Sequence, residues 1–169
     1  MASALKNLSK YDATTIPDAK NMIFGVVVAE WHTDITHPLY EACVQTLEKH
    51  GSTSIHTVQV PGTFELPVAA SMLIHNKKLD AVICIGCVIK GETSHNEYIN
   101  HSVANSISML SIQTGIPVIF GVLTPNDHQQ ALDRAGGKYG NKGVEAAVTA
   151  IRMVDLKHTL AQKDRKIGF

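Results

Sequence analysis

Hydrophobic and polar residues follow one another along the chain in blocks whose period changes repeatedly. Four short segments that are rich in β-branched residues occupy residues 23–29, 55–60, 81–89 and 117–123. The first, third and fourth are almost wholly apolar, which is typical of strands that are buried on both faces. The sequence therefore predicts four strands in a sheet that is covered on both sides.

Between these runs the apolar residues recur at helical spacing. Leu39, Cys43 and Leu47 are four residues apart and predict a helix over residues 36–50, with Pro38 in its first turn. Further helices are predicted over residues 67–77, 94–113 and 125–135, and a last one follows the segment "KYGNKG". Thr124 is the expected cap of the fourth helix.

Strands that alternate with helices in this order indicate an α/β protein with a parallel sheet. Right-handed crossovers then give a three-layer sandwich, flavodoxin-like, with a four-stranded parallel sheet. Residues 23–169 are expected to form this single domain, and residues 1–22 a flexible N-terminal arm. The binding site is expected beyond the carboxyl ends of the strands.

Composition and charge exclude several classes of protein. Apolar residues make up 44% of the 169 residues and charged residues 18%, which is typical of a globular chain. Lysine plus arginine and aspartate plus glutamate both number 15, so no general attraction to nucleic acid or anionic membrane is expected. Residues 81–89 are too short to span a bilayer, and residues 1–22 lack the apolar core of a secretion signal. A cytoplasmic protein is expected.

Two cysteines form a C-x-x-C pattern, which is found in redox and zinc sites. Cys84 and Cys87 lie within a predicted strand, where they would point to opposite faces and be too far apart for a disulfide. No second cysteine pair completes a zinc site. The pattern is therefore interpreted as structural, unless a bulge at Gly86 changes the alternation. No metal and no cofactor are expected.

The segment "GETSHNEY", residues 91–98, contains the most informative polar residues. Gly91 is expected to allow a sharp turn, and Thr93 or Ser94 to cap the following helix, with Ser94 and Glu97 spaced as a capping box. The free N–H groups of a first helical turn attract anions, although most helix starts bind nothing. His95 is expected at the sheet edge, as a proton-transfer group or as a structural histidine bonded to a backbone carbonyl.

Two other residues have both a structural and a functional interpretation, and a third has only a structural one. Arg134, near a predicted helix end, is either a favourable C-terminal cation or a phosphate ligand. Trp31 is either a packing residue or a flat wall for a heteroaromatic ring. Phe120 lies within a strand and is expected in the core.

Several segments taken together resemble the 6,7-dimethyl-8-ribityllumazine synthase family. They are "EWHTD", "VPGTFELPVAA", "IGCVIKGETSHNEYI" and "GIPVIFGVLTPNDHQQALDRAGGKYGNKGVEAA", within about residues 22–155. The resemblance implies a transferase of riboflavin biosynthesis that needs no cofactor. It condenses 5-amino-6-(D-ribitylamino)uracil with 3,4-dihydroxy-2-butanone 4-phosphate to 6,7-dimethyl-8-ribityllumazine, phosphate and water.

The resemblance also implies roles for individual residues. His95 would transfer protons, and Arg134, from a neighbouring subunit, would hold phosphate with the turn at Glu92 and Thr93. The residues that would contact the aminouracil are Trp31, Thr63, Phe64, Glu65, Cys87, Val88, Ile89 and, from the neighbouring subunit, Phe120. Lys142 would assist. The chain departs from the usual pattern at His32, Glu92 and Asn96, and the Glu92 side chain is expected to point outward.

The resemblance further implies a homopentamer with active sites between subunits, which in some members closes into an icosahedral shell of twelve pentamers. The short link "GGKYGNKG" favours the shell, the N-terminal arm would add an edge strand to a neighbouring sheet, and riboflavin synthase would be a partner. The alternative functions are a riboflavin synthase of the archaeal type and a non-catalytic flavin-binding or shell-scaffold protein.

Overall fold

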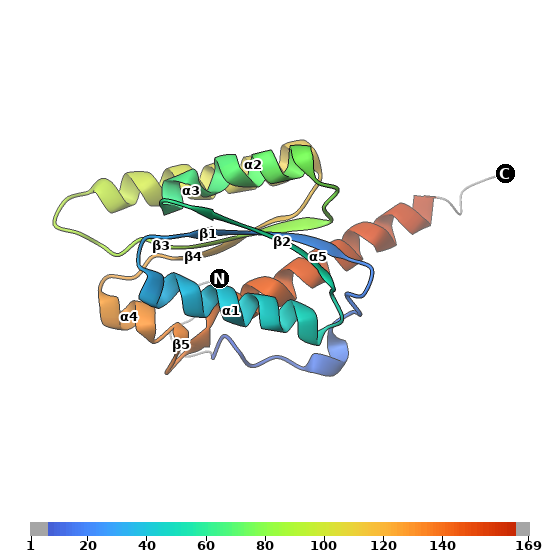
Figure 1. Cartoon of the computed structure of the whole chain (residues 1–169), viewed down its shortest axis with the longest axis horizontal. Coiled ribbons are helices and arrows are strands. Elements are labelled where there is room, and N and C mark those ends of the chain that lie inside the picture. Colours follow the sequence, from blue (N-terminus) through green and yellow to red (C-terminus); the bar gives the residue numbers. More distant parts are fainter. Residues whose placement is uncertain (1–6, 165–169) are drawn as a thin grey trace.

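A four-stranded parallel sheet forms the centre of the molecule (Figure 1). The computed structural model describes residues 7–164, and their side chains as far as residue 161. The strands are β1 (Ile23–Ala29), β2 (Ser54–Val60), β3 (Ala81–Cys87) and β4 (Val118–Leu123), in the spatial order β2-β1-β3-β4. This is the flavodoxin-like order, and it leaves β2 and β4 as the two edges. The predicted fold class is confirmed.

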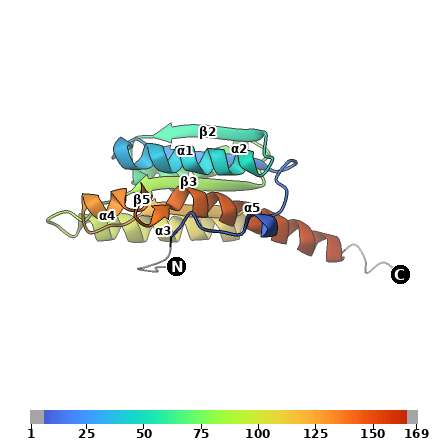
Figure 2. The same ribbon diagram turned by 90° about the horizontal axis from the view of Figure 1, so that it is seen from below.

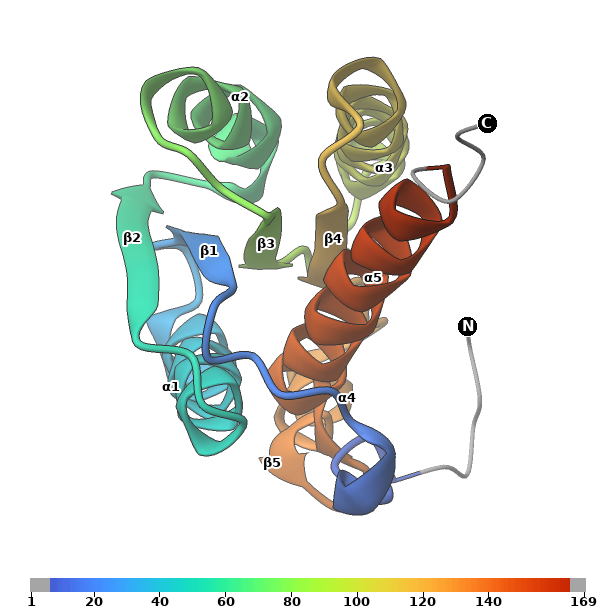
Figure 3. The same cartoon turned by 90° about the vertical axis from the view of Figure 1, so that its right-hand side faces the viewer.

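Helices cover both faces of the sheet, as the end-on view in Figure 3 shows. The helices α1 (Thr33–Lys49) and α5 (Lys142–Asp164) lie on one face, and α2 (Leu66–Asn76) and α3 (His95–Thr114) lie on the other. Alternate residues of each strand point to opposite faces, so Phe24 and Val26 pack on the side of α1 while Val27 packs on the side of α2. The predicted three-layer sandwich therefore has two apolar clusters, one between each face of the sheet and the helices that cover it.

Cys84 and Cys87 follow the same alternation. Cys87 lies in the apolar cluster on the side of α1 and α5, and Cys84 lies in the cluster on the side of α2 and α3. All three cysteines are free thiols. The predicted placement of these two side chains on opposite faces of the sheet is thus confirmed.

Residues 7–22 form a strap across the face of the domain that carries α1 and α5 (Figure 2). Ile16 and Met22 of the strap are buried in the apolar cluster on that face. The Tyr11 hydroxyl lies 3.1 Å from His50 Nε2, and Arg152 of α5 donates to Thr15 Oγ1. These contacts attach the described part of the predicted arm to the domain, and its flexibility stays a prediction.

The region after β4 differs from the prediction. The fourth helix, α4 (His128–Leu132), has only five residues and is capped by Asp127, whose carboxylate accepts from the Gln130 N–H at 2.8 Å. An aspartate cap in this position replaces the expected cap at Thr124. The chain then forms a small antiparallel hairpin, β5 (Ala135–Gly137) and β6 (Gly140–Asn141), which the apolar pattern did not predict.

Two helix starts also differ from the prediction. The helix α1 begins at Thr33, so Pro38 lies inside it and not in its first turn. The predicted capping box of α3 is wrong, because Ser94 is the N-cap but its side chain makes no capping hydrogen bond. Within residues 7–164, no helix combines the length and the apolar character that crossing a membrane requires.

Candidate functional site

A cavity of about 480 Å³ opens where the chain leaves the carboxyl ends of β1, β2 and β3. It lies at the edge of the sheet where α1 and α3 begin, on the left in Figure 1. The cavity brings together most of the predicted site residues. Its lining includes Trp31, Thr63, Phe64, Glu65, Cys87, Val88, Ile89, Thr93 and His95.

Backbone hydrogen bonds beyond the strands hold this edge together. The N–H groups of Glu30 and Trp31 donate to the carbonyls of Val60 and Pro61, at 2.8 and 3.2 Å. In the same way, the Val88 N–H donates to the Leu123 carbonyl at 2.9 Å. Segments that are distant in the sequence are therefore fixed side by side around the cavity.

An unusual backbone conformation orients Trp31. The next residue, His32, has φ 59 and is the only non-glycine residue with positive φ in the described part of the chain. Histidine is among the residues that are enriched in this left-handed conformation. Trp31 meets the His32 ring edge to face at 6.2 Å, and 69% of the Trp31 side chain is exposed. An indole held in this way offers a flat, accessible wall.

A close approach between β3 and the segment after β2 positions the floor of the cavity. The short 3₁₀ helix η2 (Thr63–Glu65) follows β2, and its buried Thr63 donates from Oγ1 to the Cys87 carbonyl at 3.3 Å. A Cβ at Gly86 would lie 2.8 Å from Thr63 Oγ1, closer than real Cβ contacts come. Glycine at position 86 thus lets η2 pack directly on β3.

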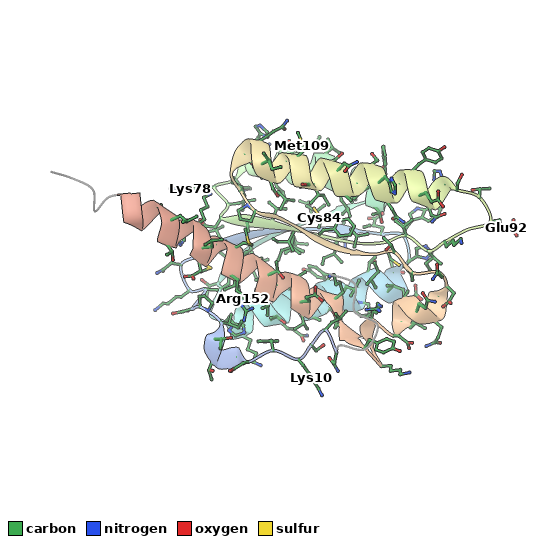
Figure 4. All side chains as sticks on the ribbon, turned by 180° about the vertical axis from the view of Figure 1, so that it is seen from behind. Lys10, Lys78, Cys84, Glu92, Met109 and Arg152 are labelled. Carbon is green, nitrogen blue, oxygen red and sulfur yellow. The ribbon has the colours of Figure 1, made fainter. Side chains whose placement is uncertain are left out.

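His95 is the first residue of α3 and lies at the cavity with Thr93. Its side chain is exposed, and its backbone N–H lies 3.4 Å from Thr93 Oγ1. Glu92 is exposed at the tip of the preceding loop and is absent from the cavity lining (Figure 4). Gly91 is expected to allow a sharp turn, but an added Cβ would meet nothing within 4 Å, so no steric contact requires glycine there.

Burial makes the cysteine in the cavity wall a poor nucleophile. Only 3% of Cys87 is exposed, and desolvation, with the nearby Asp34 carboxylate as a second cause, raises the pKa of its thiol to about 12. The thiolate is the nucleophilic form of cysteine. Cys87 therefore contributes a neutral wall and backbone groups to the cavity at neutral pH.

A second cavity, of about 390 Å³, contains the remaining predicted site residues except Glu92, which lines neither cavity. Phe120, Arg134 and Lys142 line it, at the free edge of β4, and none of them lines the first cavity. The Lys142 ammonium lies 2.7 Å from Glu145 Oε1, so part of its charge is neutralised. Within one chain, the structure does not bring Arg134 and His95 to one cavity.

The structure adds residues that were not predicted as part of the site. His32, Pro61, Gly62, Asn96 and Ile99 also line the first cavity, and Leu8 and Gln130 line the second. The position of Asn96, three residues before Ile99 on the same helix, could have indicated its place. Nothing in the sequence indicated that Leu8 would line a cavity, because its contact with the domain depends on the path of the strap.

No group of three or more histidine, cysteine, aspartate or glutamate side chains within residues 7–164 is arranged to hold a metal ion. The two cavities offer aromatic walls, the imidazoles of His32 and His95, backbone groups, and the cations of Arg134 and Lys142.

Comparison with known proteins gives a consistent result. A family model described as 6,7-dimethyl-8-ribityllumazine synthase matches residues 21–158. A protein of that name from Phocaeicola vulgatus is 49% identical over 162 residues, which cover 95% of this chain and 96% of the relative. Relatives with the same name from Parabacteroides distasonis and Cytophaga hutchinsonii are each 52% identical, over 92% and 91% of this chain and 98% of their own length.

Proposed function

The chain belongs to the 6,7-dimethyl-8-ribityllumazine synthase family, and we propose on that basis that it catalyses the condensation that gives this family its name. The substrates are 5-amino-6-(D-ribitylamino)uracil and 3,4-dihydroxy-2-butanone 4-phosphate. The products are 6,7-dimethyl-8-ribityllumazine, phosphate and water. The observation that carries this proposal is the cavity that places an exposed aromatic wall beside His95.

The first cavity is assigned to the aminouracil. Its ring stacks on Trp31, whose exposed indole offers the flat apolar face that a heteroaromatic ring needs. Thr63, Phe64 and Glu65 line the side of the pyrimidine and ribityl groups, and Cys87, Val88 and Ile89 contact the uracil. The buried Cys87 thiol fits a role through backbone groups.

The phosphate of the butanone is assigned to the start of α3 and to Arg134. The turn at Glu92 and Thr93 leads into a helix of 20 residues, whose N-terminus favours an anion through its free N–H groups and its dipole. An arginine completes such a site because its guanidinium binds phosphate through two parallel hydrogen bonds. Lys142 assists from the side of β4.

The protein acts mainly by positioning its two substrates. The amine of the uracil attacks the ketone of the butanone, so the enzyme needs no nucleophile of its own. Holding the two reactants in the correct geometry removes much of the entropic barrier. His95 exchanges protons with the reacting groups, a contribution that is typically about 10²- to 10⁴-fold in rate.

We infer that the complete site needs a second subunit, in a homopentamer. Phe120 and Arg134 lie at the edge of β4, in a cavity separate from that of His95. A neighbouring chain whose β4 edge meets the first cavity would unite the two halves. The outward sides of α2 and α3 carry large exposed apolar residues, among them Met72, Met109 and Ile112, which a neighbour would cover.

We also propose that the pentamers close into an icosahedral shell, that the protein is cytoplasmic, and that riboflavin synthase associates with it. Residues 23–169 form the catalytic domain, with residues 1–22 as its arm. Light scattering tests the assembly, because a particle with the mass of five chains would refute the shell. A single-chain mass would refute the shared site as well.

One experiment tests the reaction. Purified protein is mixed with both substrates, and the formation of fluorescent lumazine and of free phosphate is followed. Equal amounts of the two products are expected. Binding of lumazine without turnover would instead indicate a non-catalytic protein, and formation of riboflavin from lumazine alone would indicate a riboflavin synthase.

A further inference from the structure

The aromatic ring of Tyr139 lies close to two cations. The Arg134 guanidinium carbon is 5.3 Å from the centre of the ring, and the Lys138 ammonium is 5.1 Å from it. Both distances are within the range of cation–π attraction. Arg134 itself lines the second cavity with Phe120.

Backbone hydrogen bonds hold the turn that carries this ring. Tyr139 lies in the turn between the two strands, and its N–H donates to the Asp133 carbonyl at 2.7 Å. Its own carbonyl accepts from the N–H of Leu8 in the strap at 2.8 Å. The Tyr139 backbone is therefore held through both its N–H and its carbonyl. An arginine side chain has several rotatable bonds, so a contact with a held ring restricts its orientation.

The Arg134 guanidinium has no competing partner within residues 7–164. It makes no hydrogen bond or ion pair with any described side chain. The neighbouring carboxylate of Asp133 accepts instead from Gln129 Nε2 at 3.0 Å. The ring thus holds the guanidinium without using its N–H groups, which leaves them free for an anion.

We propose that Tyr139 is a positioning residue for the phosphate-bearing substrate: its ring holds the Arg134 guanidinium in the orientation that binds phosphate. This inference rests on the proposed function, in which Arg134 is the phosphate ligand. Tyr139 itself touches no reacting atom. Its effect is expected on the binding of the butanone phosphate and of inorganic phosphate, and not on the binding of the aminouracil.

Three substitutions at position 139 distinguish the effect of the aromatic face from the effect of side-chain volume. Tyr139→Leu keeps apolar volume without an aromatic face, Tyr139→Gln lacks both, and Tyr139→Phe keeps the face. The hydroxyl of Tyr139 makes no hydrogen bond with described residues, so phenylalanine removes no bond. Cation–π attraction at partly exposed sites corresponds to about a two- to five-fold change in affinity.

Steady-state kinetics and calorimetric titration with inorganic phosphate test the proposal on the assembled wild-type and variant proteins. The Leu and Gln variants should raise the KM for the butanone phosphate and the Kd for phosphate about two- to five-fold, and the Phe variant should keep both at the wild-type values. The KM for the aminouracil should stay constant in all three. Measuring both Leu and Gln ensures that a folding defect in one of them does not decide the outcome.

Other outcomes overturn the proposal, and they separate it from the proposed function. Wild-type affinities in the Leu and Gln variants, or equal losses for both substrates, would refute the role of Tyr139 while the reaction itself stands. A loss in the Phe variant as large as in the Leu variant would also refute it. Absence of lumazine formation by the wild-type protein would refute the proposed function, and an unchanged phosphate affinity in Arg134→Ala would refute the role of Arg134 on which the inference depends.

Discussion

Replacing Gly86 with alanine tests how the floor of the first cavity is built. The new Cβ would lie 2.8 Å from Thr63 Oγ1, 3.1 Å from Thr63 Cγ2 and 2.9 Å from Leu66 Cδ1. The tip of the Leu66 side chain can turn away, but Thr63 is buried and donates to the Cys87 carbonyl. The methyl group therefore has to push η2 away from β3.

Overpacking of this kind typically lowers the free energy of unfolding by about 1–3 kcal/mol. For a chain of this size, the melting temperature would fall by roughly 2–12 °C. Thermal unfolding at one fixed protein concentration measures this shift. Gly91→Ala is the matched control for stability, because a Cβ there meets nothing within 4 Å. It should change the free energy of unfolding by less than about 0.5 kcal/mol.

A double-mutant cycle identifies the residue that resists the methyl group. Thr63→Ala alone loses a hydrogen bond that contributes about 1 kcal/mol, but it also removes the two atoms that crowd position 86. The double variant should therefore be more stable than the two single losses predict, by about 1 kcal/mol. If the two effects add within about 0.5 kcal/mol, the proposed clash with Thr63 is refuted.

Three other predictions concern the site and the thiols. His95→Ala should lower kcat by about 10²- to 10⁴-fold, and a larger loss in a folded protein would contradict a positioning mechanism. Arg134→Ala should raise the KM for the butanone phosphate by about 10- to 100-fold without a similar change for the aminouracil, as initial rates at varied concentrations of each substrate will show. Burial raises the pKa of the Cys43, Cys84 and Cys87 thiols to about 12. Unfolded thiols ionise near pH 9.0 and release protons first, so the free energy of unfolding should fall from that pH upward. Urea midpoints that are equal at pH 7 and pH 10 would contradict this.

The sheet could be predicted from the sequence because β1, β3 and β4 are almost wholly apolar, whereas the edge strand β2 carries polar residues and is only partly buried. The run at residues 81–89 gave β3, although the structure ends this strand at Cys87, where the chain turns into the cavity. The hairpin β5–β6 could not be predicted in this way, because strands of three and two residues carry no recognisable period. The five-residue helix α4 depends on the cap at Asp127, which competes with an equally plausible cap at Thr124.

The candidate site was predictable to the extent that it lies directly after a strand. Trp31 and His95 come from such segments, and the edge of a parallel sheet brings them together. The separation of Arg134 from His95 did not follow from the pattern, and only the family resemblance suggested it. The Leu8 contact and the cation–π pair of Tyr139 depend on tertiary structure, which a single sequence does not display.

The left-handed conformation of His32 has a consequence for laboratory evolution of this protein. A positive φ costs a non-glycine residue about 1 kcal/mol or more, a strain that His32→Gly would relieve. The same change would remove the imidazole that meets Trp31 edge to face. Selection for heat resistance alone is therefore expected to favour glycine at position 32, which would remove the ring that contacts the indole. Selection for turnover should instead retain the strained histidine.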